Sequence, residues 1–170
     1  MQYAIIAFLT MSIAVTVTSA DPKKNSEATA DLKAIQGKWK VVKIIKEGKE
    51  LPVEALAMLD PQMVVTSATM EGLNKGMVVQ RFRISVNPNT NPKQIELQPI
   101  DEKGNAMKHN YAGPMGEARY LDARPELGIY EIKLDRLKLC IAFLEQPRAK
   151  SFGMKDTRDY TVLELEQIKK

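Results

Sequence analysis

Apolar and polar residues alternate over several short segments of the chain, most regularly in residues 78–86. There, Gln80, Phe82 and Ile84 share one face of an extended chain, and Arg81 and Arg83 share the other. A period of two residues is typical of a β-strand with one face in a core and one in solvent. We therefore predict a strand over residues 78–86 whose arginine face meets water.

Similar runs recur along the chain and are rich in β-branched and aromatic residues, which pack well on a pleated surface. They predict strands at residues 39–46, 62–69, 93–100, 127–134, 136–143 and 158–167, with a short one near 107–111. Short strands at regular spacing with polar turns favour an antiparallel barrel or sandwich. The expected fold class is all-β, with about eight strands and one or two short helices.

Glycine, proline and polar residues mark the connections. We predict a helix near residues 52–59 and one or two helical turns at 31–36, with Gly37 as the stop. Turns or loops are expected at residues 47–49, 71–76, 87–92 and 145–157. Residues 101–126 have little pattern, and a loop of that length in a small domain is either functional or mobile.

The N-terminal residues 1–20 carry no charged side chain and end in Thr18-Ser19-Ala20, a small-residue site of the kind that a signal peptidase cleaves. We predict a signal peptide at 1–20, a polar, irregular linker at 21–30, and one domain at 31–168. The protein would then be exported to the periplasm, cell envelope or medium, with no stable membrane insertion after cleavage. Because this segment has no Lys or Arg before its apolar part, an uncleaved membrane anchor is the alternative.

The charge of the chain argues against a nucleic-acid partner. The chain has 25 Lys and Arg against 21 Asp and Glu, a net charge of +4. The two signs are interleaved, and the longest purely basic runs are pairs of lysines. A nucleic-acid-binding surface would need a denser basic patch with aromatic residues between its charges.

Catalytic and metal-binding patterns are absent from the sequence. His109 is the one histidine, so a zinc site would need carboxylate ligands, and a Ser-His-Asp triad would need Ser67, Ser85 or Ser151 close to it. Cys140 is the one cysteine, which excludes an intramolecular disulfide and leaves a buried, inert thiol or a link to another chain. We predict a non-enzymatic protein without cofactor or metal.

Four segments of the chain, residues 31–42, 48–56, 86–97 and 128–140, together resemble a lipocalin-like domain family of unknown function that is abundant in planctomycete bacteria. The resemblance runs from Asp31 to Glu166. It implies a lipocalin-like β-barrel and export, and it brings no established substrate or catalytic residue. Leu134 departs from the family pattern, because it stands in a hairpin turn where the family favours Gly.

Gly37 and Trp39 match the G-x-W pattern of lipocalin-like barrels. In such barrels the tryptophan closes the floor, often under an arginine from a late strand. The resemblance therefore implies a structural role for both residues. It makes Arg158 the candidate for a cation–π contact with Trp39.

A barrel of about eight strands either holds one small ligand or is filled by its own side chains. Our leading hypothesis is a binding module for a small apolar ligand. The residues expected to line its interior are Phe82, Ile84, Tyr130, Ile132, Leu137, Leu139 and Ile141. The alternative is an envelope-associated protein-interaction or structural module that uses the 101–126 loop, with an unknown protein partner.

Overall fold

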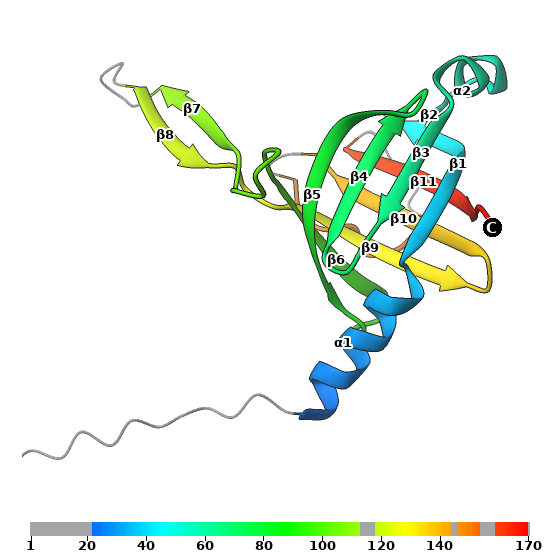
Figure 1. Cartoon of the computed structure of the whole chain (residues 1–170), viewed down its shortest axis with the longest axis horizontal. Helices are drawn as coiled ribbons and strands as arrows, with labels where there is room; N and C mark the ends of the chain where they lie inside the picture. The colour runs from blue at the N-terminus through cyan, green and yellow to red at the C-terminus, as the bar shows by residue number, and fades with distance from the viewer. Residues whose placement is uncertain (1–21, 113–117, 144–145, 154–158, 170) are drawn as a thin grey trace, which may run out of the picture.

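Eight antiparallel strands close into a barrel in the computed structural model, which describes residues 22–112, 118–143, 146–153 and 159–169 (Figure 1). Pairing of the last barrel strand with the first completes the closure. The predicted all-β barrel of about eight strands is thus confirmed. In spatial order the barrel strands are β1 (Gly37–Lys46), β3 (Pro61–Val65), β4 (Thr69–Asn74), β5 (Met77–Asn87), β6 (Lys93–Pro99), β9 (Glu126–Lys133), β10 (Arg136–Ala142) and β11 (Tyr160–Gln167).

The remaining elements lie around the two ends of the barrel (Figure 1). Helix α1 (Pro22–Ala34) precedes β1, and the short β2 (Lys49–Glu50) leads into helix α2 (Val53–Leu59). Strands β7 (Lys108–Ala112) and β8 (Ala118–Asp122) form a separate two-stranded sheet that projects from the barrel. None of the described helices is long and apolar enough to cross a membrane.

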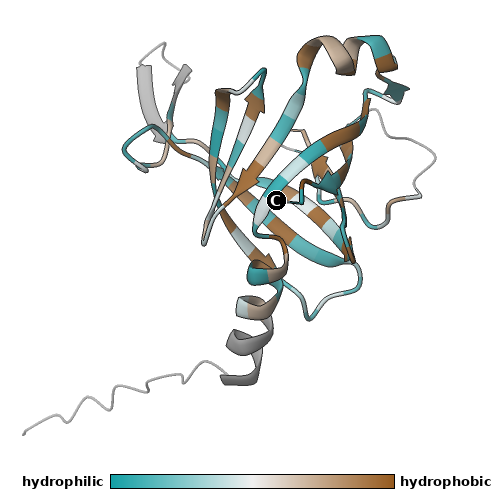
Figure 2. Ribbon diagram, turned by 45° about the vertical axis from the view of Figure 1, so that its right-hand side comes forward, coloured by the Kyte–Doolittle hydropathy of each residue, from teal (hydrophilic) through white to brown (hydrophobic). Residues whose placement is uncertain are grey.

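Apolar and polar residues alternate along the barrel strands (Figure 2), and the inward series form one hydrophobic core. In β5, Phe82 and Ile84 are buried, whereas Arg83 on the other face is exposed, as the alternation predicts. The core comprises Ile35, Trp39, Val41, Met63, Val65, Met70, Phe82, Ile84, Ile95, Leu97, Tyr130, Leu137, Leu139, Ile141, Leu163 and Leu165.

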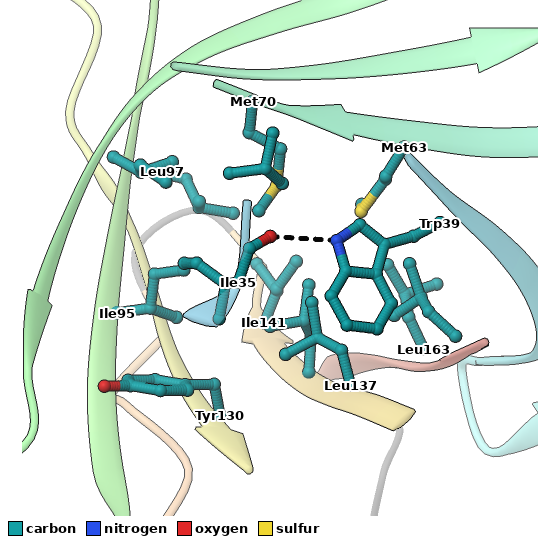
Figure 3. Packing of buried hydrophobic residues seen from close by; sticks show 14 of the residues in the cluster. Ile35, Trp39, Met63, Met70, Ile95, Leu97, Tyr130, Leu137, Ile141 and Leu163 are labelled. Atoms are coloured by element: carbon teal, nitrogen blue, oxygen red, sulfur yellow. Dashed lines mark hydrogen bonds between the residues drawn. The ribbon is translucent and has the colours of Figure 1, made fainter. Parts of the chain in front are cut away.

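Helix α1 closes one end of the barrel. Ile35, just after the helix, is fully buried, and its carbonyl oxygen accepts a hydrogen bond of 2.8 Å from Nε1 of Trp39 (Figure 3). The Asp31 carboxylate accepts hydrogen bonds from Nζ of Lys93, at 2.7 Å, and from the hydroxyl of Tyr130. Because these contacts join α1 to β1, β6 and β9, the helix seals this end.

A second apolar cluster lies outside the barrel. The residue segment 146–153 covers it and is held by Arg148, which donates hydrogen bonds to Gln94 at 2.8 Å and to Glu96 at 2.9 Å. The outward side chains beneath this segment are therefore buried too. The cluster comprises Ile129, Cys140, Ala142, Ala149, Tyr160 and Val162.

Three local predictions were wrong. The polar segment 21–30 was expected to be irregular, but helix α1 begins at Pro22 because proline suits the first helical position and alanines follow. Residues 62–69 were expected to be one strand and 71–76 a loop. Instead, β3 ends at Val65 and β4 runs through Gly72, with a bulge at Val79 in the paired strand β5. The hairpin turn between β4 and β5 therefore falls at Lys75-Gly76.

The long loop predicted at 101–126 contains a hairpin. The short strand expected near residues 107–111 corresponds to β7, and it pairs with β8, for which the alternation gave no signal. The predicted hairpin at 127–143 is confirmed to within a residue at each end as β9 and β10. The predicted signal peptide, residues 1–20, lies outside the described residues.

Candidate functional site

The seven residues predicted to line the interior all belong to the main core or pack against it. Six of them are buried, and Ile132 is partly buried at the edge. Figure 3 shows three of them, Tyr130, Leu137 and Ile141, in this cluster with Ile35 and Trp39. The middle of the barrel is therefore occupied by protein, and space for a ligand has to be sought at its ends.

At the end opposite α1 the barrel opens into a hollow of about 350 Å³, which we call the mouth. Its volume is near the lower limit of small-molecule sites. Two predicted lining residues, Phe82 and Ile141, lie in it; Ile84, Leu137 and Leu139 lie deeper, in the packed core. The apolar wall consists of Ile44, Met63, Phe82, Leu97, Ile141, Ala142, Phe143 and Leu163.

Four polar residues also line the mouth: Lys46, Gln80, Glu126 and Thr161. Strand pairing explains why they face inward. Residues directly opposite each other on paired strands share a face of the sheet. Glu126 in β9 is opposite the core residue Leu97 in β6. Thr161 in β11 is opposite the core residue Ile141 in β10 and opposite Lys46 in β1.

The fourth polar residue, Gln80 in β5, also borders the mouth. It faces inward because it lies two positions before the inward Phe82. The sequence placed Gln80 on the correct face. Glu126 was missed because it was assigned to the end of a loop. In a strand, every second residue faces the same side, so counting back from the inward Tyr130 through Gly128 would have identified Glu126 as inward.

Among these polar groups, Glu126 is the one whose burial affects its charge. Its carboxyl group is half-buried, and burial alone raises its pKa above the ordinary value of 4.5. Within the part of the chain that the structure describes, no hydrogen bond or ion pair satisfies it. Lys46, of opposite charge, is exposed to solvent and lies beyond ion-pair distance of Glu126. The mouth therefore holds a half-buried carboxyl group that has no partner among the described residues.

Tyr130 and Ile132 border a second hollow of about 590 Å³ between β9 and residues 150–152. It is larger than the mouth, but four of its polar groups are already engaged. Lys93 and the Tyr130 hydroxyl both bind Asp31, and Lys133 pairs with Glu131 at 2.8 Å. We prefer the mouth because its apolar wall is continuous with the core and because Glu126, at its rim, has no partner among the described residues.

The residues predicted to close the barrel are placed as follows. Gly37 begins β1 with φ of 126°, a conformation that other residues rarely adopt, and Trp39 is fully buried beside α1. Arg158 lies outside the described residues, so its cation–π contact with Trp39 stays a prediction. The side chain of His109 also falls outside them, and the described residues contain no group of three or more His, Cys, Asp or Glu that could hold a metal.

No protein-family model matches this chain, and comparison with curated proteins and with solved structures found no match either. The resemblance to the planctomycete lipocalin-like family stays a prediction. The geometry of the mouth is therefore the best guide to function.

Proposed function

We propose that this protein is an exported, non-enzymatic binding module that takes one small apolar ligand at the mouth of the barrel. The observation that carries the proposal is the 350 Å³ hollow, whose wall is continuous with the hydrophobic core. Burying the apolar surface of a ligand there would contribute roughly 25 cal/mol for each Å² removed from water. Because α1 plugs the other end, the ligand would enter and leave through the mouth.

Native mass spectrometry of the full chain, exported from a bacterial host, tests this proposal. A mass of a few hundred daltons that is lost on denaturation would support carriage and identify the ligand class. Gln80→Trp should block the mouth and reduce ligand occupancy. Val79→Trp is the matched control because this neighbour on β5 is 53% exposed and does not border the mouth. If the apo mass alone is seen, tight carriage of any molecule that the host supplies is refuted.

One observation favours the second candidate, an envelope-associated interaction or structural module. The β7–β8 hairpin projects from the barrel as a sheet of its own (Figure 1). A two-stranded sheet is only marginally stable by itself in water, so a partner would stabilise it. Chemical cross-linking in the native cell envelope should then give a discrete complex that disappears when residues 108–122 are replaced by a short glycine linker. Unchanged cross-linking would refute this candidate.

A further inference from the structure

The mouth contains two charged residues whose surroundings differ. Glu126 is half-buried against the apolar wall, whereas Lys46 is exposed and solvated. A charge removed from water is costly unless a partner compensates it, and Glu126 has none among the described residues. A ligand that brings a cation would therefore gain more at Glu126 than an anion would gain at Lys46.

We propose that the mouth selects small amphipathic amines, with the ammonium group paired to the Glu126 carboxylate and the hydrocarbon part against the apolar wall. This inference rests on the proposed binding function and names its ligand class. An ammonium group has three N–H donors. One would meet Glu126, and water at the open mouth would accept the others.

An anionic amphiphile fits the mouth less well. Its head group would bring a second negative charge close to Glu126, and like charges disfavour ionisation of a carboxyl group. Its attraction to Lys46 would be weakened by the water around that exposed side chain. A neutral alcohol avoids the repulsion but gains only an ordinary hydrogen bond.

Three probes with the same hydrocarbon chain test the proposal: octylamine, octanol and octanoate, titrated calorimetrically into the full-length protein at neutral pH. We expect octylamine to bind about tenfold more tightly than octanoate, the difference that one charge-assisted hydrogen bond supports. Glu126→Gln should lose about tenfold in octylamine affinity and keep its octanol affinity. Glu131→Gln is the matched control, because Glu131 lies on β9 away from the mouth and pairs with Lys133 at the surface.

The outcomes separate the two proposals. Equal affinities for the three probes, or a preference for octanoate, would leave the binding function standing and overturn the amine selectivity. Loss of octylamine affinity in Glu131→Gln as large as in Glu126→Gln would also overturn it. If the wild-type protein binds none of the three probes, the mouth is not a site for small amphiphiles and both proposals fail. Octanol binding by Glu126→Gln shows that this variant is folded.

Discussion

Adding a single methyl group at Gly128 should destabilise the barrel. Gly128 lies in β9, faces inward and is opposite Ile95. A Cβ atom at this position would lie 3.0 Å from the carbonyl oxygen of Cys140 and 3.0 Å from Cγ2 of Ile95. One of these neighbours is backbone of the adjacent strand, which moves only if the ladder between β9 and β10 moves with it.

Two effects of opposite sign set the magnitude. Overpacking a filled core costs typically about 1–3 kcal/mol. Replacing Gly by Ala returns about 0.4–1 kcal/mol, because the unfolded chain has fewer conformations to lose. We therefore expect Gly128→Ala to lower the free energy of unfolding by about 1–2 kcal/mol. The steric term outweighs the entropic one because the contact at Cys140 is with backbone.

Gly72→Ala is the matched control in β4. Its Cβ would lie 3.8 Å from Cβ of Gln80, an ordinary contact, so this variant should keep or slightly increase stability. Urea unfolding followed by far-UV circular dichroism and by the fluorescence of the buried Trp39 gives both free energies. The reasoning is refuted if Gly128→Ala is as stable as the wild type, or if Gly72→Ala loses as much as Gly128→Ala.

Three further predictions concern single side chains. Burial raises the pKa of Glu126, so its ionisation opposes folding; Glu126→Gln should therefore be more stable than the wild type at neutral pH. That advantage develops as the pH rises from 4.5 through the folded pKa, and urea midpoints that stay parallel from acid to neutral pH would contradict it. Leu134→Gly should raise the free energy of unfolding by about 0.5–1 kcal/mol. Leu134 is 98% exposed and has φ of 54°, a left-handed conformation that strains any residue with a Cβ. Leu134→Ala keeps that strain, so equal unfolding midpoints for the two variants would show that strain is absent. Burial raises the pKa of Cys140 to about 11 and leaves the thiol 1% exposed, so iodoacetamide should alkylate it only in denaturant; rapid labelling of the native protein would disprove this.

Local alternation determined most of the barrel. The period of two residues in segments 78–86 and 136–143 required strands with one apolar face, and polar turns between such strands required antiparallel neighbours. It also placed Phe82 and Ile141 on the inward face, where both border the mouth. These features depend only on residues that are close together in the sequence, so they can be predicted without the tertiary structure.

Only the tertiary structure decided what covers each face. Cys140 is on the outward face of β10, yet it is buried because residues 146–153, held by Arg148, fold over it. Glu126 looks like a loop residue in the sequence, and it became part of a site only when β9 paired with β6 opposite Leu97. Closure between β1 and β11 joins residues more than a hundred positions apart, such as Trp39 and Gln167. Alternation shows that a strand has two different faces. What each face packs against depends on pairing between residues far apart in the sequence, and no local pattern encodes that pairing.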